Sequence, residues 1–138
     1  MKQNQQDDFT KILSNLSETQ IVTEQITPDK YKISCPFYAK VDDGDEYEIF
    51  LISDNEKFYL SDEGATYREL DKIFELAESD VIRNLTAIME RFGCSKHSSK
   101  DTENVIIIEC TPKNVFSKLG HLVQTCSFML NMRIFYVY

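Results

Sequence analysis

The sequence predicts an α+β fold, in which an antiparallel β-meander is packed by an N-terminal helix, a helical hairpin and a long C-terminal helix on one sheet. Three observations lead to this prediction: apolar residues recur at helical spacing near both ends, they alternate in the middle, and turn residues separate these segments. A length of 138 residues with 42% hydrophobic residues suits a single domain spanning residues 1–138.

The first half of the chain contains the predicted first helix and the meander. Apolar residues at helical spacing between Phe9 and Leu16 predict a short helix. Strands are expected at residues 21–26, 31–40, 47–52 and 58–60, separated by turns rich in Pro, Asp, Asn and Gly. Because Pro36 has no N–H to donate, we expect its strand to lie at a sheet edge or to pair on one side there.

The second half is expected to contribute the remaining helices. Thr66 and Glu69 have the spacing of a capping box, so a helix is predicted to start near Thr66. A second helix follows from Ser79 and stops at Gly93, and the two would form a hairpin. Residues 95–103 are interpreted as a surface loop, residues 105–108 as a strand, and Pro112 as the first position of the long last helix.

Composition limits the class of protein. The N-terminal residues lack a basic stretch followed by an apolar one, so we expect no secretory signal and a cytoplasmic location. The longest aliphatic run, Val105 to Ile108, is far shorter than a membrane span. Cys35, Cys94, Cys110 and Cys126 are expected to be reduced. Four scattered glycines provide no phosphate-binding loop, so no cofactor is predicted.

Charge is the most informative feature. Between Asp42 and Asp80 the chain has 14 acidic and 3 basic residues, whereas the rest has 9 acidic and 12 basic residues. Such a field attracts basic partners and repels nucleic-acid phosphates, so direct nucleic-acid binding is not expected. The residues predicted to bind a basic protein partner are Asp42, Asp43, Asp45, Glu46, Glu48, Asp62 and Glu63. The alternative is that these acids form a solvated face that only keeps the protein soluble.

The same acids suggest a rival function as a metal-dependent, nuclease-like hydrolase using the region from Asp42 to Asp62. Asp42, Asp43, Asp45 and Glu46 crowd oxygen ligands around Gly44, but they lack the spacing of a calcium loop. A restriction-type nuclease needs Glu-x-Lys on a strand next to a second acid, and the sequence does not contain that pattern in the right place. We therefore assign no catalytic or metal-binding residue.

Cysteine, histidine and aromatic residues supply two weaker hypotheses. Cys94 and His97 have a spacer seen in zinc sites, and Cys110 and His121 would have to complete the ligand set. A helix end followed by a loop histidine is the simpler explanation of the pair, and we favour it over a zinc site. The aromatic residues at the chain end either complete the core or form a self-association surface, and the latter would make the protein a homodimer. The residues in that second case are Phe135, Tyr136 and Tyr138.

One segment carries a family resemblance. Residues 58–70 read Phe-Tyr-Leu-Ser-Asp-Glu-Gly-Ala-Thr-Tyr-Arg-Glu-Leu. This resembles the hallmark of a prokaryotic and phage family catalogued as domain of unknown function 1828: an aromatic residue, Leu-Ser-Asp, an acid, Gly and an apolar helix start. The likeness covers about residues 27–92. The resemblance implies a bacterial or phage origin and supports the fold, but it names no chemistry.

The function expected from these observations is that of a small, non-catalytic binding module. It would dock on a basic protein and modulate or inhibit it, for example a host-defence or nucleic-acid enzyme.

Overall fold

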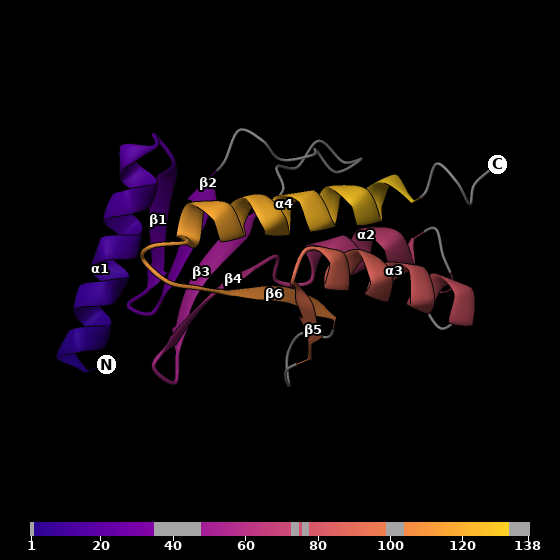
Figure 1. Cartoon of the computed structure of the whole chain (residues 1–138), viewed down its shortest axis with the longest axis horizontal. Helices are drawn as coiled ribbons and strands as arrows, with labels where there is room; N and C mark the ends of the chain where they lie inside the picture. The colour runs from indigo at the N-terminus through magenta and orange to yellow at the C-terminus, as the bar shows by residue number, and fades with distance from the viewer. Residues whose placement is uncertain (1, 35–47, 73–74, 76–77, 99–103, 133–138) are drawn as a thin grey trace.

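The structure is a computed structural model, which describes residues 2–34, 48–72, 75, 78–98 and 104–132. These residues form four helices and one six-stranded antiparallel sheet, which confirms the predicted α+β class with its N-terminal and long C-terminal helices (Figure 1). The elements are α1 Gln3–Glu18, β1 Val22–Thr27, β2 Lys30–Ser34, β3 Ile49–Asp54, β4 Lys57–Ser61, α2 Ala65–Asp71, α3 Ser79–Arg91, β5 Ser95–His97, β6 Val105–Cys110 and α4 Val115–Asn131.

The sheet has the strand order β1-β2-β3-β4-β6-β5. Its first four strands form the expected meander, and β6 then inserts between β4 and the short edge strand β5. Over residues 30–34, β2 is an inner strand, because it pairs with both β1 and β3. The rest of the strand predicted at residues 31–40, including Pro36, lies outside the described residues.

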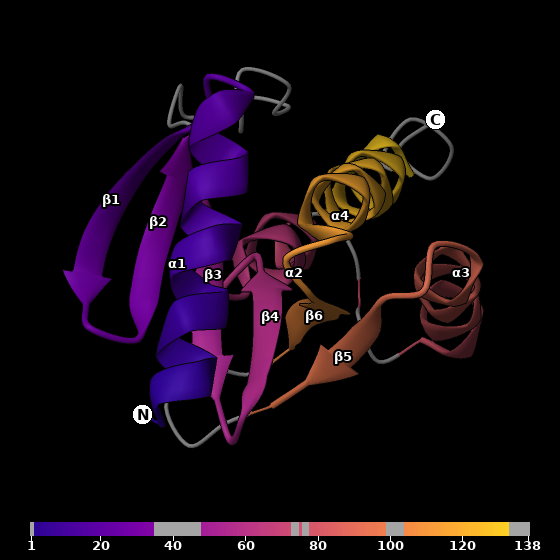
Figure 2. The same cartoon turned by 60° about the vertical axis from the view of Figure 1, so that its left-hand side comes forward.

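The helices pack on one face of the sheet. Leu51, Leu60 and Ile108 lie opposite one another on β3, β4 and β6, and all three are buried. They belong to one hydrophobic core together with Leu85 of α3 and Leu122 of α4. Figure 1 shows α4 running lengthwise over the strands, and Figure 2 shows α1 crossing in front of the sheet while β1 remains at its outer edge.

Helix α1 is an integral part of this core. Ile12 and Leu16 are fully buried, and the Phe9 ring stacks on Phe58 of β4 with centroids 5.7 Å apart. The side-chain amide of Asn15 also donates a hydrogen bond to the carbonyl of Pro112, in the turn before α4, at 2.7 Å. The amphipathic pattern that predicts this helix therefore reflects a real buried stripe.

Helix α3 ends where the sequence predicts. Gly93 has φ +77°, a left-handed conformation that costs glycine little. The N–H of Gly93 donates to the carbonyl of Glu90, and the N–H of Cys94 donates to that of Met89. This pair of bonds is a Schellman motif, which satisfies two carbonyls that would otherwise be unpaired at the helix end.

Two sequence-based boundaries are wrong. The predicted loop at residues 95–103 begins with a strand, β5, whose three exposed residues Ser95–His97 pair with β6. Helix α4 begins at Val115, three residues after Pro112, because the Asn114 side chain accepts a hydrogen bond from the Thr111 N–H and closes a turn there. Both features depend on pairings that local propensity does not reveal.

Candidate functional site

The Ser-Asp-x-Gly connection between β4 and α2 is organised by the buried side chain of Asp62. Its carboxylate is 1% exposed and accepts three backbone hydrogen bonds, from Gly64 at 2.9 Å, Thr66 at 3.0 Å and Ile106 at 2.9 Å. The N–H of Asp62 also donates to the carbonyl of Ile106 at 3.2 Å. The side chain therefore extends the pairing of β4 with β6 and at the same time caps α2.

This arrangement corrects the predicted capping box. Helix α2 begins at Ala65, and the acceptor at its N-terminus is Asp62, four residues before the Thr66 N–H it binds. Thr66 is fully buried, and its hydroxyl has no hydrogen-bond partner among the described residues. Glu69 pairs with Lys72 at 2.9 Å. The Ser-Asp-x-Gly segment, and not the Thr-x-x-Glu segment, starts the helix.

The structure assigns different environments to the predicted partner-binding acids. Asp62 is buried, so its carboxylate has no surface that a docked partner would touch. Glu63 is half-buried and forms an ion pair with Lys30 at 3.4 Å. Glu48 is exposed, 3.6 Å from Lys32. The other members of the set, Asp42, Asp43, Asp45 and Glu46, lie outside the described residues, as do the aromatic residues Phe135, Tyr136 and Tyr138.

The acidic stretch does not form one continuous patch in the described part of the chain. Glu48 precedes β3, whereas Asp54 ends it, so the length of the strand, about 20 Å at 3.3 Å per residue, separates the two. Glu56 lies in the β3–β4 turn and pairs with Lys2 before α1. The acids thus gather at both ends of the β3–β4 hairpin.

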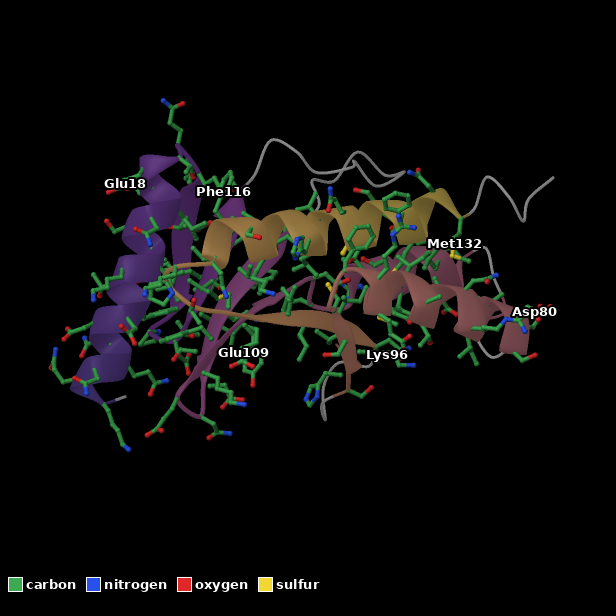
Figure 3. The ribbon with its side chains drawn as sticks, viewed as in Figure 1. Glu18, Asp80, Lys96, Glu109, Phe116 and Met132 are labelled. Atoms are coloured by element: carbon green, nitrogen blue, oxygen red, sulfur yellow. The ribbon has the colours of Figure 1, made fainter. Side chains whose placement is uncertain are left out.

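The face of the sheet opposite the helices is the best candidate for an interaction surface. Because side chains alternate along a strand, the neighbours of the buried Leu51, Leu60 and Ile108 point to this face. We call it the open face. Among its described residues are Glu24, Lys30, Lys32, Glu48, Phe50, Ile52, Tyr59, Glu63, Ile107 and Glu109. Figure 3 shows Glu109 on the side of β6 away from α4.

The centre of the open face is apolar, and its margin is charged. Phe50, Ile52, Tyr59 and Ile107 are half-buried side chains from the three adjoining strands β3, β4 and β6. The Phe50–Ser61–Ile107 and Ile52–Tyr59–Glu109 rows of the ladder place them side by side. An aromatic, partly solvated centre within a polar rim is typical of protein–protein interfaces.

The rim of the open face has a net negative charge. Lys32 lies 3.2 Å from Glu24, whose carboxylate is the main cause of a raised pKa for Lys32, with a smaller contribution from Glu48. Lys30 lies 4.7 Å from the centroid of the Phe50 ring and also pairs with Glu63. Among the residues named, two lysines therefore face four glutamates, the fourth being Glu109, and the Asp54–Lys57 pair on the same face adds no net charge.

The charged and polar side chains do not assemble into a metal or catalytic centre in the described part of the chain. No three His, Cys, Asp or Glu side chains among those residues come close enough together to hold a metal ion. The best-defined hollow near the acids has a volume of about 530 Å³, and no His or Cys lines it. It is lined by Lys2, Gln5, Pro28, Asp29, Ser53, Asp54, Asn55 and Glu56.

Cys94 is held in a structural environment. Its thiol is 6% exposed and lies 3.2 Å from the Thr125 hydroxyl, which donates to the carbonyl of His121. Burial raises the pKa of Cys94, and the nearby Asp62 carboxylate adds to this effect. A neutral, buried thiol is a poor nucleophile. Cys94 and Cys110 are free thiols, and His97 is exposed on β5.

Comparison with known proteins places the chain in a family. Residues 35–129 match the model of the family described as domain of unknown function DUF1828. The chain belongs to this family. No curated protein and no solved structure matches it.

The DUF1828 segment includes β3, β4, α2, α3, β5, β6 and most of α4, whereas α1, β1 and β2 precede it. It contains the Phe58–Leu70 motif and Asp62, which joins β4, α2 and β6, and it contains the apolar centre of the open face. The rim is shared, because Glu24, Lys30 and Lys32 lie before the matched residues.

The sequence alone did not reveal the apolar centre of the open face. Residues 47–52 are apolar on both faces, a pattern that predicts a central strand, and β3 is an inner strand of the sheet. The described helices pack on the other face. Only the combination of alternating strands with helices on one side could have indicated that Phe50, Ile52 and Tyr59 lie half-buried on the face opposite those helices.

Among the helices of the described residues, none combines the length and apolar character needed to span a bilayer.

Proposed function

We propose that this DUF1828 protein is a small cytoplasmic binding module of bacterial or phage origin that docks on a basic protein and modulates or inhibits it. A host-defence or nucleic-acid enzyme is an example of such a target. The observation that carries the proposal is the open face, where an apolar, aromatic centre lies within a net negative rim. In the sequence, Asp42, Asp43, Asp45 and Glu46 shortly precede Glu48 and add further negative charge to the chain.

Each part of the open face has a distinct role in this proposal. Tyr59 and Phe50 offer large, fairly rigid surfaces that bury apolar area on docking. Glu24, Glu48, Glu63 and Glu109 steer a basic partner toward the face and raise its association rate. Lys30 and Lys32 are already paired with glutamates, so a cationic partner competes for the same carboxylates.

The test is affinity capture from bacterial lysate at low and high salt, with bound proteins identified by mass spectrometry and the best candidate then purified and titrated. We expect a basic protein whose affinity falls as salt rises. Tyr59→Ala should weaken binding at least about tenfold, because truncating a central aromatic residue removes a hot spot. Glu48→Lys combined with Glu109→Lys should reduce the association rate.

Two controls make the result specific. Ile82→Ala removes an apolar side chain of α3 that is 44% exposed and lies outside the open face, so it should bind like the wild type. Replacement of Asp42, Asp43, Asp45 and Glu46 by lysine separates the contribution of that segment from that of the described rim. If the purified candidate binds wild type and Tyr59→Ala equally, the open face is not the docking surface. If no basic protein is retained at low salt, the proposed function is wrong.

A further inference from the structure

Helix α4 has a solvent-facing side without charged residues. We call this side the outer arc of α4; it consists of Phe116, Ser117, Gly120, Gln124, Ser127, Phe128 and Asn131. Phe116 and Phe128 are 55% and 53% exposed, and Figure 3 shows Phe116 on the side of α4 away from β6. In a chain with 28% charged residues, the only Lys, Arg, Asp or Glu of α4 is Lys118, which is half-buried outside this arc. A solvated helix face normally carries charges.

Gly120 is the second unusual feature of the outer arc. Glycine in the middle of a helix is destabilising relative to alanine. Nothing in the described part of the monomer accounts for it, because a Cβ built on Gly120 would meet no atom within 4 Å, and its φ is not in the left-handed region. A glycine that neither packing nor backbone conformation requires is explained if a second backbone approaches it closely.

From these observations we infer that a second copy of this chain packs on the outer arc, forming a two-fold symmetric homodimer through antiparallel α4 helices. Charge favours this occupant. A foreign basic protein is attracted to the acids elsewhere, whereas two copies with a net charge of −8 each repel one another unless they meet through an uncharged surface.

The arc is complementary to itself about such an axis. Leu122 is fully buried, so the midpoint of the arc lies opposite it on the helix. Phe116 and Phe128 lie six residues to either side of Leu122, so a two-fold axis at this midpoint places Phe116 opposite Phe128 of the second copy. Gly120 then lies opposite Gln124 of the second copy, where the absence of a side chain lets the helices approach. The same surface used twice is what a two-fold interface requires.

Phe128 is ordered before any partner binds. Its ring stacks on Phe92 at the end of α3, with centroids 5.5 Å apart and planes 28° from parallel. The guanidinium of Arg91 in turn lies 6.0 Å from the centroid of the Phe92 ring. A side chain that is already held in place loses less conformational freedom on association. Only one side of a helix of 17 residues is exposed, so the interface is small and we expect a reversible dimer with a micromolar dissociation constant.

The test is sedimentation velocity of the full chain from about 1 µM to about 300 µM, a range that brackets a micromolar dissociation constant. The wild type should shift from its monomer mass of 16.1 kDa toward twice that value. Gly120→Ala should raise the thermal midpoint of the monomer while weakening the dimer at least about tenfold, because alanine improves the helix but separates the backbones. If Gly120 had a structural role only within the monomer, Gly120→Ala would not raise the thermal midpoint and weaken the dimer at the same time.

Phe128→Glu should remain folded by circular dichroism and stay monomeric at every concentration. Ile82→Glu introduces the same charge at an exposed apolar position of α3 outside the arc, and it should dimerise like the wild type. A wild type that sediments as a monomer up to the highest concentration overturns the inference, as does a dimer that both Gly120→Ala and Phe128→Glu leave unchanged. The measurement is independent of the proposed function, since it needs no basic partner. A dimer of this kind would leave both open faces available.

Discussion

At the scale of single residues, Asp62 shows what the aspartate of the Ser-Asp-x-Gly segment does in this chain. Its two carboxylate oxygens satisfy three backbone N–H groups, from Gly64 in the turn before α2, from Thr66 in α2 and from Ile106 in β6. Such charge-assisted bonds are stronger than those between neutral groups, and a buried N–H left without a partner is costly. The residue that looked like part of an acidic docking surface is therefore a structural centre of the fold.

Asp62→Asn should lower the free energy of unfolding by about 3 kcal/mol, because an amide has one acceptor oxygen and places an NH₂ group against a backbone donor. Urea denaturation monitored by circular dichroism measures the change. Asp54→Asn, at the exposed end of β3, is the matched control and should stay within about 0.5 kcal/mol of the wild type. Equal stability of the two variants would contradict the role assigned to Asp62.

The buried phenol of Tyr67 and the buried thiol of Cys110 predict a loss of stability at alkaline pH. Burial, assisted by the Asp62 carboxylate, raises the pKa of Tyr67 from 10.0 to about 12. Burial, assisted by Glu109, raises the pKa of Cys110 from 9.0 to about 12. At a pH between the ordinary pKa of each group and its raised pKa in the folded chain, the unfolded chain has released the proton that the folded chain still holds. Unfolding therefore becomes more favourable as pH rises.

The contribution of Tyr67 should therefore be complete below pH 10.0 and should be lost as pH rises toward about 12, with Cys110 beginning its decline from pH 9.0. The free energy of unfolding, measured by urea titration at a series of alkaline pH values, should fall less steeply with pH for Tyr67→Phe than for the wild type. Identical slopes would mean that the phenol of Tyr67 titrates alike in both states.

At the scale of elements, helix ends illustrate how far local signals reach. The glycine that ends α3 was predictable, because the need for a left-handed residue after the last turn of a helix depends only on neighbouring residues. The start of α2 at Ala65 agrees with the predicted start near Thr66. Its cap was not predictable, because the acceptor is Asp62, which follows β4 and is held in place by pairing with β6. The start of α4 was displaced by the Asn114 side chain, which competes with the predicted threonine cap.

Gly93→Ala should destabilise the protein by about 1 to 2 kcal/mol, since a Cβ is disfavoured at φ +77° even though no atom lies within 4 Å of it. The measurement is the free energy of unfolding from urea titration. Gly120→Ala is the informative comparison, since the same substitution at a helical φ should increase monomer stability. If Gly93→Ala and Gly120→Ala changed the free energy of unfolding in the same direction, backbone conformation would not be the main cause of either effect.

At the scale of the whole molecule, the first 34 residues precede the family match but share its core. Helix α1 contributes Phe9, Ile12 and Leu16 to the same cluster as Leu60 and Leu122, and β2 extends the sheet from β3. These residues also provide Lys30, Lys32 and Glu24 to the open face. The segment before the match thus shapes both the stability and the charge of the candidate site.

Ile12→Ala should lower the free energy of unfolding by about 3 to 4 kcal/mol, because it leaves a cavity at a fully buried position. Unfolding should remain a single transition by both circular dichroism and tyrosine fluorescence, as expected when α1 and the sheet unfold together. Ile82→Ala, at a position 44% exposed, should have a much smaller effect. Separate transitions for the two probes would indicate that α1 is an independent unit.

The sequence by itself determined the α+β class, the order of the four helices and of all strands except β5, the turn after β1 and the end of α3, because periodicity and turn residues act over a few neighbours. The likeness to the DUF1828 family was also visible in the sequence. Only the tertiary structure decided that Asp62 is buried, that β5 exists, that the described acids separate to both ends of a hairpin, and that aromatic residues of β3 and β4 occupy the face opposite the described helices. Each of these depends on which distant strand or helix is adjacent, and long-range pairing is what local propensity does not contain.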